Sequence, residues 1–298
     1  MATNPTVRQR ELGKRLRDLR NQHGLTVEDV AEKLLCSATK ISRLETGARR
    51  PSLRDVRDLS GVYGLDGAET AWLMELAREA REQVWWTQYL DLNLDPYLGL
   101  EEDAIAITSF TTFYIPALLQ TEDYTRAIIS SIAPKMDPDI LRQRVVVRMR
   151  RQQLLEGDIR PRYRVLIDEA VLHRAIGGPV VMAAQLAKVL EAEKRGKVTV
   201  QVVPFETGAH VAQDSNFILF EFEEGSILPP VVFVEGLTGN QYLEKPADLS
   251  RYREAIEYLR DAALTPRDSL GRIDEIRKAY ASAKRPAGVV HNDKGAER

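Results

Sequence analysis

The chain has 298 residues, 44% of them hydrophobic, and a formal net charge of −2. This length and composition make two domains with buried cores the default expectation. A single cysteine excludes a disulfide framework or a thiolate metal site. No run of about 18 uncharged apolar residues is present and the first residues lack an apolar stretch, so we expect a cytoplasmic protein without a membrane span or secretory signal.

The positive charge is concentrated in the first fifth of the chain. Residues 1–60 hold 13 Lys and Arg against 8 Asp and Glu, which gives +5, whereas residues 61–298 hold 29 against 36, which gives −7. A locally basic segment of this kind suits a surface that faces a polyanion.

The N-terminal segment has the period of helices. Leu12, Leu16 and Leu19 lie at spacings of four and three, which predicts an amphipathic helix over about 9–22. A similar pattern predicts another helix over about 68–84.

Capping signatures predict three more helices between these two. Thr26 is followed three residues later by Asp29, and Ser52 by Asp55, the pattern that begins a helix. A short helix is expected after Ser37. Residues 1–82 are thus predicted to form a bundle of five helices.

The rest of the chain alternates helical and strand patterns. The predicted strands are rich in β-branched and aromatic residues, and lie at 162–168, 198–204, 217–222 and 231–237. Predicted helices lie near 101–110, 122–132, 137–156, 169–175, 180–194, 248–264 and 268–283. The fold class is therefore multidomain, α followed by α+β, with a mixed α/β domain over 83–284 that contains a sheet of about four strands. Residues 285–298 lack an apolar face and are expected to be disordered.

The sequence "LLCS" at 34–37 joins two predicted helices by a tight turn. The second helix begins at Ala38 and directs Ile41 and Leu44 to the core. This arrangement is a helix-turn-helix, whose second helix can enter the DNA major groove. Cys36 is expected to be a small apolar turn residue rather than a redox switch.

The outer face of that second helix supplies the predicted base-reading residues. Arg43 has the length and donor geometry for two hydrogen bonds to guanine, and the methyl groups of Ala38 and Thr39 suit a thymine methyl. Lys40 shares this face. Outside such a motif, Lys40 and Arg43 would be read as solvated surface charges.

A second group of residues is predicted to contact DNA phosphates. Thr26 begins a helix whose free N–H groups suit an anion, and Arg49 and Arg50 follow the second helix. The predicted phosphate contacts are Thr26, Ser37, Ser42, Arg49 and Arg50. The alternative role of Arg49 and Arg50 is solubility.

The run "GLTVEDVAEKLLCSATKISRLETGARRPS", residues 24–52, resembles the Cro/CI-type (XRE-family) helix-turn-helix of phage repressors and bacterial regulators. The resemblance covers all five predicted helices. Many members of this family carry glutamine at the position of Val27, and glutamine or arginine at the position of Ala38. The amide contacts to phosphate and adenine that those side chains make should therefore be absent here. The resemblance also implies that Arg20 and Glu45 form a buried structural pair.

The later stretches "FYIPALLQTEDYTRAI", residues 113–128, and "PFETGAH", residues 204–210, resemble a domain of actinobacterial WhiJ-like, antitoxin-like regulators. Ala117 replaces a glycine frequent in relatives. The resemblance spans about 85–275 and implies a regulator that works with a small co-encoded partner protein; it implies no substrate.

Enzyme chemistry has one weak candidate. Asp168 and Glu169 end a predicted strand with His173 one helical turn beyond, a grouping that suits acid–base chemistry but is more often a helix start. His173 and His210 are also candidates to line a ligand or partner pocket, although a histidine in a glycine-containing loop such as His210 is more often a satisfied turn residue. No phosphate loop, nucleophile elbow or histidine ligand pair is present, so we expect no enzyme activity, no cofactor and no metal.

Trp85, Trp86 and Tyr89 follow the helical segment. They are expected to form a buried plug between domains, with a hinge or dimer contact as the alternative. The combined prediction is a homodimeric, sequence-specific DNA-binding transcriptional regulator whose larger domain takes a small protein or ligand. Two alternatives stay open: an enzyme localised to DNA by its helix-turn-helix, and an antitoxin-like interaction protein.

Overall fold

A computed structural model describes residues 5–81, 85–86, 89, 95–157, 161–224, 228–236 and 239–283. The described residues form two compact units. One contains those within 1–107, 159–162 and 218–250, and the other those within 108–158, 163–217 and 251–298. The predicted domain boundaries at 82/83 and 284/285, and the tail at 285–298, lie outside the described residues.

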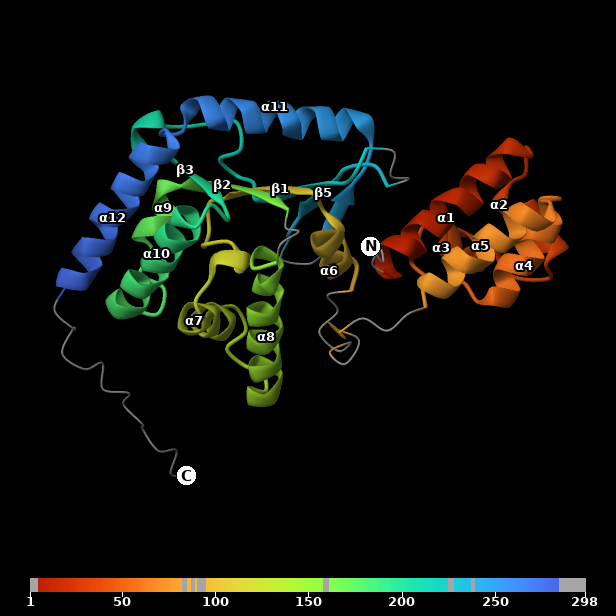
Figure 1. The fold of residues 1–298 in the computed structure, drawn as a ribbon, viewed down its shortest axis with the longest axis horizontal. Helices are drawn as coiled ribbons and strands as arrows, with labels where there is room; N and C mark the ends of the chain where they lie inside the picture. The colour runs from red at the N-terminus through yellow and green to blue at the C-terminus, as the bar shows by residue number, and fades with distance from the viewer. Residues whose placement is uncertain are drawn as a thin grey trace, which may run out of the picture. The chain divides into compact units, whose positions relative to one another are not determined.

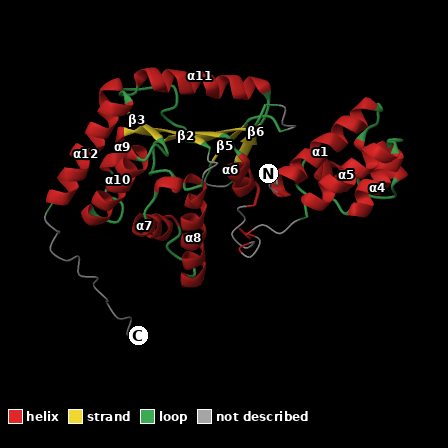
Figure 2. Cartoon of the chain, viewed as in Figure 1, coloured by secondary structure: helices red, strands yellow, loops and turns green. Residues whose placement is uncertain are grey.

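The N-terminal part of the first unit is entirely helical (Figures 1 and 2). Each predicted cap is present: Thr26 and Ser52 form capping boxes with Asp29 and Asp55, and the Ser37 side chain accepts the N–H of Lys40. Because these side chains bind N–H groups that have no partner within the helix, they determine where each helix begins. The helices are α1 (Pro5–Gln22), α2 (Val27–Lys33), α3 (Ala38–Glu45), α4 (Leu53–Val62) and α5 (Gly67–Glu79).

The following domain contains a mixed sheet of six strands in the order β3-β2-β1-β4-β5-β6. Strands β2 and β3 are parallel, with Val165 opposite Val200, and β5 and β6 are antiparallel. The strands are β1 (Ala106–Thr111), β2 (Arg162–Asp168), β3 (Thr199–Val203), β4 (Phe217–Glu221), β5 (Val231–Val234) and β6 (Gln241–Leu243).

The predicted count of about four strands is wrong, because β1 and β6 were missed. Strand β1 falls largely in the segment 101–110 that was expected to be helical. All six of its residues are buried, so it lacks the alternation of apolar and polar residues that marks a half-buried strand. Strand β6 has only three residues, too few for a period to show. The other four strands match their predictions within a few residues.

Helices accompany this sheet in both units. In the second unit α12 packs on α10 and on β3. None of the described helices is both long enough and apolar enough to cross a bilayer. The helices are α6 (Asp95–Asp103), α7 (Glu122–Ile132), α8 (Pro138–Arg151), α9 (Glu169–His173), α10 (Pro179–Lys194), α11 (Pro246–Ala262) and α12 (Pro266–Ser282), with single 3-10 turns at Ala117–Leu119, Gln152–Leu155 and Phe205–Thr207.

The stretch "PALLQT" is held by a buried amide network. The fully buried Gln120 donates from Nε2 to the carbonyl of Ile115 at 2.6 Å and accepts the hydroxyl of Thr125 at 3.1 Å. Gln185, also fully buried, accepts the N–H of Thr121 and donates to the carbonyl of Leu119, both at 2.7 Å. These amides satisfy backbone groups of a segment that lies inside the core but outside any α-helix or strand, which gives this motif a structural role.

The aromatic residues after α5 differ in burial. Trp86 is buried and its ring meets that of Trp85 edge to face at 5.4 Å. The indole N–H of Trp85 donates to Glu102 of α6 at 3.0 Å. Burial of Trp86 agrees with a packing role for this residue.

Candidate nucleic-acid interface

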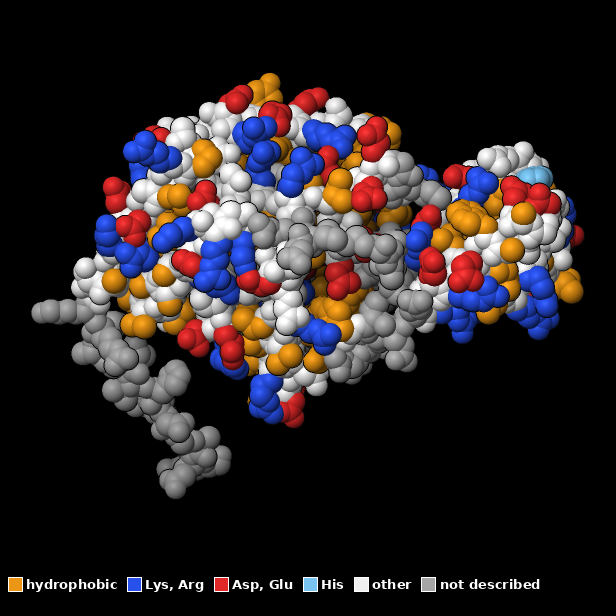
Figure 3. All heavy atoms as spheres, in the orientation of Figure 1, with side chains coloured by type: hydrophobic (Ala, Val, Ile, Leu, Met, Phe, Trp, Pro, Cys, Tyr) orange, Lys and Arg blue, Asp and Glu red, His pale blue; other side chains and the backbone are white. Residues whose placement is uncertain are grey.

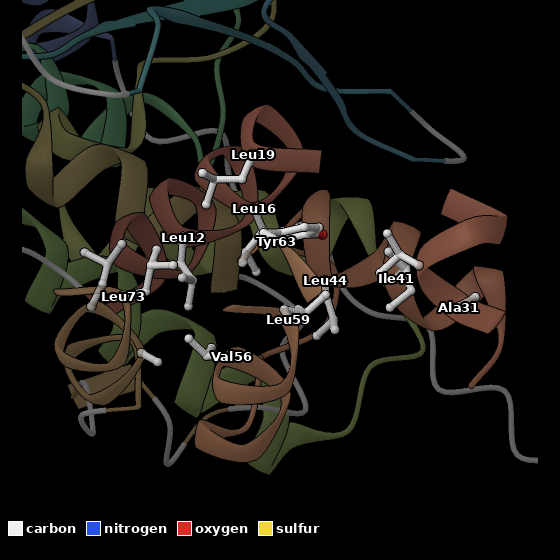
Figure 4. Packing of buried hydrophobic residues seen from close by; sticks show 13 residues of the cluster. Leu12, Leu16, Leu19, Ala31, Ile41, Leu44, Val56, Leu59, Tyr63 and Leu73 are labelled. Carbon is white, nitrogen blue, oxygen red and sulfur yellow. The ribbon is translucent and has the colours of Figure 1, made fainter. Parts of the chain in front are cut away.

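The core of the helical bundle determines which side of α3 faces outward. Ile41 and Leu44 are buried in the same hydrophobic cluster as Leu12 and Leu16 of α1 (Figure 4). Since these positions lie three residues apart on one side of the helix, the residues on its other side must project away from the core. Thr39, Ser42 and Arg43 are accordingly exposed, and Ala38 and Lys40 are half-buried.

The turn between α2 and α3 contains an unusual leucine. Leu35 has φ of +50°, the only positive φ among the described non-glycine residues, and its side chain is 95% exposed. Such a left-handed conformation is unfavourable for a residue with a Cβ by about 1–2 kcal/mol. The turn is nevertheless closed, because the N–H of Cys36 donates to the carbonyl of Ala31 at 2.9 Å.

We expect Leu35→Gly to raise the free energy of unfolding of the bundle, by about 0.5–1 kcal/mol. Glycine adopts this conformation without strain, and part of the gain is offset by its greater freedom in the unfolded chain. The neighbouring Leu34→Gly is the matched control, since Leu34 has φ of −98° and packs against the core. It should lower stability by more than about 1 kcal/mol. Urea denaturation of both variants measures the effect, and destabilisation by Leu35→Gly would contradict the assigned strain.

The two predicted base-reading cations differ sharply in their surroundings. The guanidinium of Arg43 makes no hydrogen bond or ion pair with any described residue, and it is exposed. The ammonium of Lys40 lies 2.5 Å from Oδ1 of Asp55 on α4. Arg43 is therefore available to a ligand, whereas Lys40 is already neutralised. Asp55 was recognised in the sequence only as a capping residue, because pairing across two helices leaves no local signal.

Arg20 and Glu45 lie side by side between α1 and α3. Arg20 donates from Nε and Nη2 to the two carboxylate oxygens of Glu45 at 2.7 and 3.0 Å, and from Nη1 to the carbonyl of Leu25 at 2.8 Å. The Glu45 side chain is only 3% exposed. This paired geometry fixes the C-terminal end of α3 against α1 and keeps both residues away from solvent.

The predicted phosphate contacts have varied surroundings. Thr26 is exposed, but its hydroxyl accepts the N–H of Asp29, whose carboxylate lies at the same helix end. Arg49 is exposed without a side-chain partner among the described residues. Arg50 is half-buried and donates from Nε to Gln9 of α1 at 3.2 Å.

The remaining two predicted phosphate contacts, Ser37 and Ser42, are both exposed.

On the face drawn in Figure 3, blue basic and red acidic side chains are interspersed over the molecule. The +5 balance of residues 1–60 is therefore not expressed as a uniformly basic surface on this face. An anionic ligand is indicated instead by two exposed arginines without a side-chain partner among the described residues, Arg43 and Arg49.

The candidate residues of the larger domain form two polar clusters, one around Asp168 and one around Glu169. Asp168 accepts from Nε2 of His210 at 3.3 Å, and the His210 side chain is only 5% exposed. Glu169 accepts from Nη1 of Arg272 at 2.5 Å, the N–H of Phe205 at 3.0 Å and Nε2 of His173 at 3.4 Å. Arg272, a partner more than a hundred residues away, had no sequence signal.

The polar contacts of Asp168 and Glu169 are those of structural residues, which hold parts of the fold together. Burial alone would raise the pKa of Glu169, but the hydrogen bonds from Phe205, Arg272 and His173 outweigh it and lower the pKa. A carboxylate held ionised by fixed donors is a weak proton acceptor. Within the part of the chain that the structure describes, no three His, Cys, Asp or Glu side chains gather as metal ligands would.

Comparison with known proteins adds two matches to family models. Residues 11–73 match a helix-turn-helix domain, and residues 94–275 match the domain of unknown function DUF5753. The chain is also similar to the HTH-type transcriptional regulator DdrOP3 of Deinococcus deserti, with 31% identity over 91 residues, which cover 30% of this chain and 70% of that protein. The chain thus carries an XRE-like helix-turn-helix domain and belongs to the DUF5753 family.

Proposed function

We propose that the protein is a sequence-specific DNA-binding transcriptional regulator with α3 as its recognition helix. The observation that carries this proposal is the exposed guanidinium of Arg43, which has no partner among the described residues on a helix whose other side is anchored in the core. A buried ion pair and three capped helices keep α3 rigid, so a base-reading side chain would start from a defined position.

The proposed complex follows from helix-turn-helix geometry. Arg43 reads guanine, and the methyl groups of Ala38 and Thr39 lie against bases. Arg49 contacts a phosphate and adds affinity without sequence preference. Two copies of the chain would place their recognition helices about 34 Å apart on a pseudo-palindrome.

The larger domain is proposed to be the regulatory half. In line with its resemblance to antitoxin-like, WhiJ-like regulators, it would take a small partner protein or ligand that binds one arrangement of the dimer better than another. We propose that it acts by binding and not by catalysis, since Asp168 and Glu169 are each committed to structural partners.

The test compares three alanine variants of the full chain on duplexes selected from a random pool. Arg43→Ala should weaken binding of the selected duplex by about 1–3 kcal/mol and abolish the preference for guanine at the position that Arg43 contacts. Arg49→Ala should weaken all duplexes alike and lower the slope of log affinity against log salt by about 1. His173→Ala, in the larger domain, should change neither. Intact sequence preference in Arg43→Ala would refute the proposed role of α3.

A further inference from the structure

The recognition helix carries two basic side chains, and one of them is held by its neighbour. Lys40 Nζ lies 2.5 Å from Asp55 Oδ1, and the two side chains are 28% and 16% exposed. Partial burial excludes much of the water that would otherwise screen this pair. The ammonium is therefore bound to α4 and not extended from α3.

The carboxylate of Asp55 is fixed on its other side as well. Its Oδ2 accepts the backbone N–H of Ser52 at 2.9 Å and the Ser52 hydroxyl at 2.7 Å. This capping box places the acid in the first turn of α4, where the helix dipole favours a negative charge. Burial alone would raise the pKa of Asp55, but the contacts with Lys40 and Ser52 lower it. Both oxygens of the acid are thus committed.

Arg43, three residues further along α3, supplies the contrast. Its guanidinium is exposed and has no partner among the described residues. A free lysine beside it would bind any phosphate, which raises affinity for all DNA without discriminating between sequences. A paired lysine adds little to such binding, because reaching a phosphate would leave Asp55 without its counter-charge.

We propose that Asp55 is a specificity-determining residue: by pairing with Lys40 it withholds this ammonium from DNA phosphates and leaves recognition to Arg43. The inference rests on the proposed DNA-binding function. It differs from the sequence-based prediction that Lys40 reads bases, and it assigns to α4 a part in discriminating operator from random DNA. Specificity is gained by suppressing an unselective contact.

The first test is Asp55→Asn in the full chain, which keeps an acceptor for Ser52 while releasing Lys40. One added phosphate contact should raise affinity for a random-sequence duplex roughly five- to tenfold near 0.1 M salt and steepen the salt slope by about 0.9. The ratio of specific to random affinity should fall. Unchanged affinity for the random duplex, or weaker binding, would overturn the inference.

Glu75→Gln is the matched control for charge. It also removes one carboxylate and releases one arginine, Arg78, from a 2.5 Å pair. Helix α5 packs on α1 and α4, so this change does not release a cation on α3. Random-duplex affinity should change less than twofold, and a rise equal to that of Asp55→Asn would overturn the assignment to Lys40.

Lys40→Gln tests the same point with the Asp55 cap left intact. If Lys40 contacts no phosphate, the salt slope should stay within about 0.3 of the wild-type value, whereas loss of about 0.9 would overturn the inference. The two proposals fail separately. Loss of sequence preference in Arg43→Ala supports the recognition helix whatever the Lys40 result, and the slopes on random DNA decide only the role of Asp55.

Discussion

Arg20→Ala should destabilise the helical bundle by about 3–5 kcal/mol. The substitution leaves the Glu45 carboxylate, 3% exposed, with Arg17 Nε at 3.8 Å as its remaining basic neighbour. An ionised group in such a site loses its two hydrogen bonds from Arg20 while it stays largely shielded from solvent, which is costly. Amide hydrogen exchange, followed peptide by peptide in the full chain, reads the free energy of local opening of these two helices.

Two further variants decide whether the buried charge is the cause. Replacing Arg20 by Met together with Glu45 by Leu removes both charges and should recover most of the lost stability. Arg54→Ala breaks a surface pair with Asp58 in which Arg54 is 82% exposed, so it should cost less than about 0.5 kcal/mol. A double variant as unstable as Arg20→Ala would show that shape, and not charge, is what the bundle loses.

The hydroxyl of Tyr63 provides an independent test of packing in the helical bundle. It is buried, without a hydrogen-bond partner among the described residues, and burial raises its pKa. Tyr63→Phe should therefore leave the bundle as stable or make it slightly more so, since no hydrogen bond is lost. A clear loss of stability would contradict this picture of the hydroxyl.

Glu169→Ala should destabilise the second unit by roughly 2–4 kcal/mol. Its carboxylate, 3% exposed, joins the end of β2 to Arg272 on α12 and to the N–H of Phe205 after β3. Removing it leaves that N–H and the guanidinium without their acceptor. The cost is placed below that of Arg20→Ala because Arg272 is 29% exposed and water can partly replace its partner. Hydrogen exchange of the α9 and α12 peptides measures the change.

Glu169 also predicts how the stability of the second unit depends on pH. The pKa of Glu169 is lower in the folded protein than its ordinary value of 4.5, so the unfolded chain takes up the proton first as pH falls. The stabilisation is complete above about pH 5 and is lost as pH falls through the folded pKa. Glu169→Gln should flatten this acid limb. Glu206→Gln, a change at a 71% exposed neighbour 3.8 Å from the same arginine, should not.

Prediction from the sequence succeeded where the signal is local. The caps Thr26, Ser37 and Ser52 begin their helices in the structure because each binds N–H groups within three residues. Four of the strands carry β-branched runs bounded by turn formers and were placed within a few residues. Strand β1 was taken for helix because complete burial removes its period.

In the candidate site, too, features set by local spacing could be predicted from the sequence and features set by tertiary contacts could not. Burial of Ile41 and Leu44 follows from helical spacing alone, and so does the exposure of Thr39 and Arg43. The pairing of Lys40 with Asp55 does not, because fifteen positions and a loop separate them. Nor does the left-handed Leu35, whose conformation is set by the closure of the turn onto Ala31.

By itself the sequence determined that the chain begins with a helix-turn-helix, where each helix starts and which face of α3 points outward, because these depend on contacts within a few residues. Only the tertiary structure decided which charges on that face are free. A charge is neutralised by whichever opposite charge the fold brings within about 4 Å. Asp55 reaches Lys40 from another helix, and Arg272 reaches Glu169 from a distant part of the chain.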